Sequence, residues 1–126
     1  MRFLALAATF ILAAAAPASA QTMNAQHFHK RATALQKKGP MALFSRSEIS
    51  ALMKEGKAAT ERARAQRLAA VKAGTKPRYC PPEGPQSLDS REFMKRLAAI
   101  PEAERSRIDM TEAMTRILAA KYPCSA

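Results

Sequence analysis

The chain has 126 residues, with 21 Lys and Arg against 10 Asp and Glu, so its formal net charge is +11. A chain of this length forms one small domain, which excludes the large enzyme folds with a deep, multi-residue active site. No nucleophile elbow, His-Glu-x-x-His motif or Gly-rich phosphate loop occurs in it. We therefore expect a protein that is not an enzyme and that needs no cofactor or metal ion.

The N-terminal segment has the features of a secretory leader. Of the first 20 residues 16 are apolar, and Arg2 is the one charged residue. The apolar stretch behind Arg2 covers 14 residues, which is short of the roughly 20 that span a bilayer. Pro17 ends this stretch, and an Ala-x-Ala cleavage site ends at Ala20. We expect residues 1–20 to be a cleaved signal peptide and residues 21–126 to be a single helical domain, periplasmic or secreted.

Cys80 and Cys124 are the two cysteines of the chain. In an oxidising compartment a disulfide is the default for such a pair. A bridge that closes a loop of about 45 residues stabilises a fold by about 4 kcal/mol on chain-entropy arithmetic. A small core needs this support, since 19 of the 44 apolar residues after Ala20 are Ala. The alternative, a reactive or metal-binding thiol pair, lacks a Cys-x-x-Cys motif and a nearby His.

Gly and Pro separate the predicted helices, and no strand-like alternation occurs between them. A first helix starts at the N-cap Asn24, carries Phe28, Ala32 and Leu35 on one face, and ends at Gly39-Pro40. The apolar run that follows, Met-Ala-Leu-Phe at 41–44, predicts a turn or short helix that plugs the core.

A long helix follows from a capping box formed by Ser45 and Glu48, and it runs to Ala73. Its length is about 40 Å if it is continuous, so we expect the distal part to project beyond the core. The last large apolar side chains on it are Leu68 and Val71. The predicted inner stripe consists of Ile49, Leu52, Met53, Gly56, Ala59, Thr60 and Ala63.

A stiff Pro-rich loop at 79–85 separates this helix from the last two. The third helix starts near Asp89 or Ser90 and stops at Pro101, and the fourth starts at Asp109 with Glu112 three residues on. The sequence thus predicts an all-α fold, a small bundle of about four helices that includes one long basic helix and is stapled by one disulfide. The apolar residues expected in the core are Phe93, Met94, Leu97 and Ile100 on the third helix, and Met110, Ala113, Met114, Ile117 and Leu118 on the fourth.

The charge is divided unevenly between the two halves of the domain. Residues 24–78, the basic helical half, carry 13 basic and 3 acidic residues, whereas residues 79–126, the disulfide-framed half, carry 7 of each. We expect the basic residues of the long helix to form a face that steers an acidic partner. Nucleic acid is not favoured, because no aromatic residues interleave with the charges. The alternative is a solvated face without a partner. The predicted basic face consists of Lys54, Lys57, Arg62, Arg64 and Arg67.

Other candidate residues have simpler structural interpretations. His27 and His29 lie two residues apart on a helix, so their imidazoles point to different faces and do not converge on a metal. Six Met follow the leader, four of them at core-facing positions; packing is the first interpretation and an adaptable Met-lined interface the second. Helix capping and helix dipoles explain the carboxylate pairs Glu102 with Glu104 and Asp109 with Glu112.

Three features occur together in the C-terminal part of the chain: Cys80-Pro81-Pro82, an amphipathic helix ending at Ile100-Pro101, and a final helix closed by Tyr122-Pro123-Cys124. In these features it resembles the Rap/Tai-type immunity proteins of type VI secretion systems. Members of this family are small, helical, disulfide-bonded periplasmic proteins, often dimeric, that bind and block a cell-wall amidase effector. The resemblance therefore implies a protein partner and allows a homodimer. It assigns no binding residue in the basic half.

Together these observations predict a secreted periplasmic binding protein, with inhibition of a cell-wall amidase effector as the specific hypothesis. Such an inhibitor occludes the active-site cleft of its target, and the basic helix steers the association. The alternative is a cationic envelope protein that binds an anionic surface polymer through the basic helix between Lys54 and Arg67.

Overall fold

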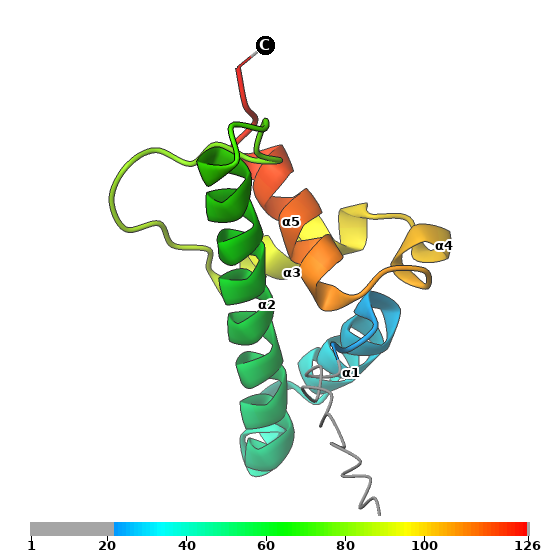
Figure 1. The fold of residues 1–126 in the computed structure, drawn as a ribbon. Coiled ribbons are helices and arrows are strands. Elements are labelled where there is room, and N and C mark those ends of the chain that lie inside the picture. The colour runs from blue at the N-terminus through cyan, green and yellow to red at the C-terminus, as the bar shows by residue number, and fades with distance from the viewer. Residues whose placement is uncertain (1–21, 126) are drawn as a thin grey trace, which may run out of the picture.

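The computed structural model describes residues 22–125, and within that range the chain consists of helices joined by loops (Figure 1). The predicted all-α fold is confirmed, and two short helices, η1 and α4, supplement the four that the sequence predicted. The predicted signal peptide lies outside the described residues. The elements in chain order are α1 (Ala25–Lys37), the 3-10 helix η1 (Gly39–Phe44), α2 (Arg46–Lys72), α3 (Ser90–Ala99), α4 (Glu102–Arg105) and α5 (Met110–Lys121).

None of the helices between residues 22 and 125 combines the length and the apolar character that crossing a bilayer requires.

Three of the helices start at the N-caps that the sequence predicted. The Asn24 side chain accepts hydrogen bonds from two backbone N–H groups of the first turn of α1. Asp89 caps α3 and Asp109 caps α5 in the same way, each through one backbone N–H at 2.8 Å. These bonds satisfy donors that the first helical turn leaves free, and they fix where each helix begins.

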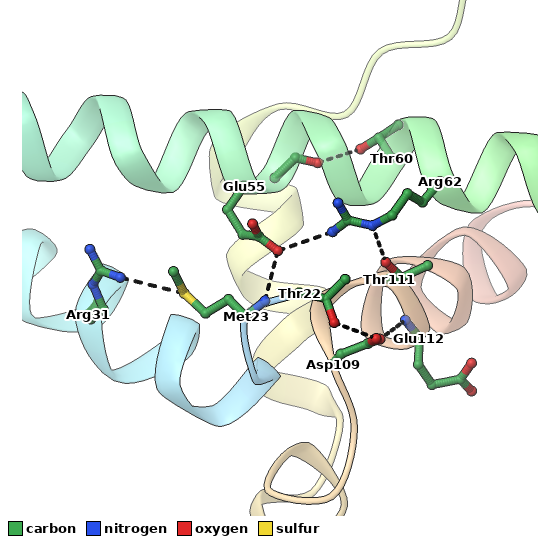
Figure 2. Close-up of polar contacts among 10 residues, drawn as sticks. Thr22, Met23, Arg31, Glu55, Thr60, Arg62, Asp109, Thr111 and Glu112 are labelled. Atoms are coloured by element: carbon green, nitrogen blue, oxygen red, sulfur yellow. Dashed lines mark hydrogen bonds and ion pairs between the residues drawn. The ribbon is translucent and has the colours of Figure 1, made fainter. Parts of the chain in front are cut away.

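The segment before α1 is fastened to the start of α5. The backbone N–H of Met110 donates to the Met23 carbonyl at 2.8 Å. The Thr22 hydroxyl donates to the Asp109 carboxylate at 2.8 Å, and Figure 2 shows this bond beside the cap of α5. The N-terminal end of the described chain is thereby held to the start of α5 by hydrogen bonds between residues more than 80 positions apart.

α2 is one continuous helix of 27 residues, about 40 Å long at 1.5 Å per residue. The capping box predicted at its start is not formed. Ser45 closes η1 with φ −102° and ψ 44°, and its hydroxyl accepts a hydrogen bond from Lys38 Nζ at 3.0 Å. Glu48 pairs instead with Arg31 of α1, at 2.6 and 2.7 Å. The prediction was wrong because charged partners from other elements, which local spacing does not reveal, take both side chains.

The core is centred on α5, which lies along α2 and is also packed by α1 and α3 (Figure 1). The five apolar residues predicted to face inward on α5 are all buried, and Leu97 and Ile100 of α3 are buried as well. On α2 the buried residues are Leu52, Ala59 and Ala63. Two of these three are Ala, and their small side chains allow α2 and α5 to pack closely. Leu68 and Val71 are 47% and 55% exposed, so the last turns of α2 add little to the core.

The predicted disulfide between Cys80 and Cys124 is formed, with the two Cα atoms 4.9 Å apart. It joins the end of α5 to the loop that follows α2. The Cys80 N–H also donates to the Tyr122 carbonyl at 2.8 Å. The bridge and this hydrogen bond fix one end of the Pro-rich loop.

The buried arginine of α4 is a feature that the sequence did not predict. Arg105 is only 7% exposed. Its guanidinium donates to the backbone carbonyls of Ala98 and Ile100 at the end of α3, and its Nε donates to Gln26 Oε1 at 2.8 Å. These bonds satisfy carbonyls that the end of α3 leaves without a helical partner and link α3 to α1.

Candidate functional site

The 3-10 helix η1 does not plug the core, contrary to the prediction for residues 41–44. Gly39, at φ +54°, turns the chain out of α1, and η1 follows on the surface. Met41, Leu43 and Phe44 are 63%, 71% and 84% exposed. A 3-10 helix repeats every three residues, so only one of its three rows can face inward, and Ala42 occupies that row. Three large apolar side chains of η1 are therefore exposed to solvent.

An apolar groove of about 690 Å³ opens beside η1, between α1, α2 and α3. Its floor is the edge-to-face pair of Phe28 and Phe93, whose ring centres lie 5.7 Å apart. Gly56 of α2 lines the groove, and a Cβ atom built on it would meet no heavy atom within 4 Å. The groove is open at this point because a glycine stands where most helices carry a side chain. The other apolar residues of its walls are Ala32, Leu35, Ala42, Ile49, Leu52, Met53, Leu88, Met94 and Met114.

Three methionines, from three different helices, line the groove. Met114 and Met94 line the groove from α5 and α3, and Met53 lines it from α2 although it is 71% exposed. The prediction that Met53 belongs to the core was wrong, because the α1 and η1 segments stop short of covering it. Flexible thioether side chains adapt to differently shaped apolar partners. The first interpretation, packing, is confirmed for Met110 and Met114, which are 0% and 3% exposed, and the Met-lined interface stays a prediction.

The charged groups around the groove are all cationic. Lys57 lies on its wall, and a shallower depression that shares Ile49, Met53 and Lys57 with it is lined by Arg46 and Lys54. Neither lining contains an Asp or Glu. The nearby Glu48 is held by Arg31, which lowers the pKa of this carboxyl through a direct hydrogen bond. The groove and its extension therefore present an apolar surface with a positive border.

The five residues of the predicted basic face do not form one face. Arg62 lies eight residues after Lys54, about 80° further round the helix, and it points toward α5. Its Nε donates to Thr111 Oγ1 at 2.7 Å and a terminal nitrogen contacts Glu55 at 3.2 Å, as Figure 2 shows. Glu55 also accepts a hydrogen bond from the Met23 N–H at 3.1 Å. Arg62 is thus a structural residue that connects α2, α5 and the N-terminal segment.

The other four predicted residues divide between two sites. Lys54 and Lys57 border the apolar groove near η1. Arg64 and Arg67 line a separate cleft between the second half of α2 and the Pro-rich loop. Charge counts along a sequence reveal the density of cations on α2, but they do not reveal that a helix distributes them over several faces.

The histidines and carboxylate pairs occupy the positions of structural residues. His27 is exposed, and His29 is half-buried, with burial and the nearby Arg105 lowering the pKa of its imidazole. Glu112 lies between Arg78 and Arg116, and the hydrogen bond from Arg78 is the main cause that lowers the pKa of the Glu112 carboxyl. Within residues 22–125 no three His, Cys, Asp or Glu side chains come together as metal ligands would.

Comparison with known proteins adds no relative: no family model, no curated protein and no solved structure matches this chain.

Proposed function

We propose that the protein is a secreted, non-enzymatic binding protein of the periplasm, and that its groove takes an apolar segment of an acidic partner protein. The observation that carries this proposal is the concave apolar surface beside Met41, Leu43 and Phe44, which are 63–84% exposed. A chain with few large apolar residues gains no folding stability from placing three of them in solvent. Contiguous exposed apolar surface of this kind is typical of interaction sites.

The positive charges around the groove indicate that an acidic partner fits it. Its border carries Lys57, Lys54 and Arg46 and no carboxylate. A second copy of the chain would bring these cations against cations in a pairing of groove with groove, which costs free energy. An acidic segment with apolar side chains, by contrast, matches both the interior and the border. The proposal is therefore a complex with a different protein rather than a homodimer.

The resemblance of residues 80–124 to Rap/Tai-type immunity proteins supports a specific partner class, a cell-wall amidase effector. In this proposal the protein inhibits the enzyme by covering its active-site cleft. Binding of an anionic envelope polymer is the competing function. It has less support because Arg62 of the proposed polymer-binding face is engaged by Thr111 and Glu55.

A variant that fills the groove tests the proposal. We would express the full chain with its own leader, purify the protein from the periplasmic fraction, and use it to capture partners from periplasmic extract. Gly56→Phe places a ring in the groove, at a position where an added Cβ atom meets no heavy atom within 4 Å. The control, Ala65→Phe, adds the same ring to the exposed side of the same helix. Circular dichroism verifies that both variants fold.

The proposal predicts that the wild type and Ala65→Phe capture a cell-wall hydrolase and inhibit the purified enzyme. Gly56→Phe should lose at least about tenfold in affinity for it, which corresponds to 1.4 kcal/mol. Equal capture by Gly56→Phe would contradict the groove as the site. Recovery of anionic polymer alone, lost at high salt, would support the competing function. N-terminal sequencing of the purified protein tests the predicted cleavage after Ala20.

A further inference from the structure

The cleft between α2 and the Pro-rich loop has the features of a second, independent binding site. It has a volume of about 830 Å³. In Figure 1 the loop after α2 swings away from the helix and returns to start α3. Arg64 and Arg67 line the cleft from α2, Tyr79 and Pro82 from the loop, and Tyr122 from the end of α5.

The loop wall of this cleft is held in place before any ligand arrives. The disulfide fixes it at Cys80. The Tyr122 hydroxyl donates to Gln86 Oε1 at 3.0 Å, and Lys121 Nζ donates to the Ser87 carbonyl at 3.1 Å. Three prolines line the cleft and restrict the backbone further. A wall fixed in this way loses little conformational entropy when a ligand binds.

Arg67 is the exceptional residue of the cleft. Six arginines of residues 22–125 are buried or half-buried. Five of them donate hydrogen bonds to protein oxygens: Arg31, Arg62, Arg96, Arg105 and Arg116. For the sixth, Arg67, the described residues supply no acceptor, and its Nε is shielded from solvent. Its guanidinium carbon lies 5.4 Å from the centre of the Tyr79 ring, which orients the group.

The remaining charges of the cleft are Arg64 and Glu83. Neither forms an ion pair with another residue of the described range, and both side chains are exposed. A guanidinium that is partly removed from water and has no acceptor is favourably paired with an oxyanion, which it can hold with two parallel hydrogen bonds. Tyr79 is buried beneath Arg67, whereas the Tyr122 ring and the prolines of the loop offer an apolar surface to the rest of such a ligand.

We propose that this cleft binds an organic carboxylate with an apolar body, such as the C-terminal carboxylate of a peptide that ends in an aromatic residue. Arg67 and Arg64 hold the carboxylate, and Tyr122 and Pro82 contact the apolar part. Glu83, on the loop wall of the cleft, repels the bound carboxylate because both groups are negatively charged. This site is separate from the groove near η1 and does not depend on the function proposed for that groove.

Titration of the isotope-labelled protein with N-acetylphenylalanine, followed by NMR, tests the proposal. We expect saturable shifts at residues of the cleft with a dissociation constant of about 1 mM or less. N-acetylphenylalanine amide, which lacks the charge, should bind at least about tenfold more weakly. Inorganic phosphate, which lacks the apolar body, should also bind more weakly. Absence of saturable shifts in the cleft, or equal binding of the amide or of phosphate, would overturn the proposal.

Substitutions test which residues of the cleft bind the carboxylate. Arg67→Gln should weaken binding about tenfold or more, and Arg64→Gln, at an exposed position that cannot disturb the fold, about threefold. Glu83→Gln should strengthen binding about threefold because it removes the opposing charge. Arg107→Gln is the matched control at an exposed arginine outside the cleft, and it should change nothing, as should Gly56→Phe in the groove. Equal affinity of Arg64→Gln and wild type would contradict the assignment.

Discussion

The middle of α2 and its first turns use apolar residues in opposite ways. In the middle, Ala59 and Ala63 are 0% and 1% exposed and lie in the core. In the first turns Met53 is 71% exposed, and Phe44, just before the helix, is 84% exposed. Two of the three buried residues of α2 are alanines, whereas the large side chains of Met53 and Phe44 are outside. This is the reverse of what burial for stability alone would favour.

The difference separates the residues whose positions are explained by folding from those whose positions are not. The helices α2 and α5 approach closely through alanines, and the disulfide supports this half. The first turns of α2, with η1 and α1, leave an apolar groove with a positive border. Stability explains the first region, whereas for the second we propose a partner.

Removal of the disulfide should have the largest effect on stability. The double substitution Cys80→Ser and Cys124→Ser releases a loop of about 45 residues and should lower the free energy of unfolding by about 4 kcal/mol. Urea denaturation monitored by circular dichroism measures this loss. A loss below about 1 kcal/mol would show that the loop is held mainly by its hydrogen bonds.

Enlargement of a buried alanine should have the next largest effect. Ala63→Leu adds three carbon atoms where the side chain is 1% exposed, and overpacking of this kind costs about 2 kcal/mol. The same measurement on Ala65→Leu, at an exposed position of the same helix, is the control and should show little change. If the two variants were equally stable, α2 and α5 would not be closely packed.

A smaller effect should come from the carboxylate that ties the loop to α5. Glu112 accepts hydrogen bonds from Arg78 and Arg116, and Arg78 is the main cause of its lowered pKa. A carboxyl whose pKa is lower in the folded state stabilises the fold above its ordinary pKa of about 4.3 and loses this contribution as the pH falls further.

The variant Glu112→Gln should therefore be about 1 kcal/mol less stable than the wild type at pH 7. The difference should shrink as the pH falls below about 4, where the wild-type carboxyl takes up its proton. Urea denaturation at a series of pH values checks both statements. A difference independent of pH would contradict the role given to the charge of Glu112.

The smallest change in stability is expected at the exposed apolar surface. Phe44→Ser removes a ring that is 84% exposed and should alter the free energy of unfolding by no more than about 0.5 kcal/mol. Phe28→Ala, at a ring only 5% exposed, should cost about 3 kcal/mol. A large loss in Phe44→Ser would mean that η1 supports the fold.

The sequence predicted the parts of the fold that depend on local chemistry. Asn24, Asp89 and Asp109 cap their helices because an N-cap needs only a short polar side chain and the next turn of backbone. The spacing of the apolar residues on α5 predicted its buried face correctly. The capping box at Ser45 was wrong because Arg31 and Lys38, from other elements, bind its two side chains.

The candidate sites depend on packing that local patterns do not contain. The groove needs α1, α2 and α3 in place, and Gly56 becomes informative only when the space around it is known. The sequence shows that α2 carries many cations, but it does not show that they lie at different sites of the fold. Lys57 borders the groove, Arg62 points into the fold and Arg67 lies under the loop.

Site-specific photo-crosslinking in living cells tests the central claim, that the surface at η1 binds a different protein, most directly. The full chain would carry p-benzoylphenylalanine in place of Phe44, or in place of Leu68 at the other end of α2, where the side chain is 47% exposed. We predict one discrete adduct with a heterologous periplasmic protein from position 44 and none from position 68. An adduct with a second copy of the chain, adducts with lipid alone, or equal adducts from both positions would contradict the account.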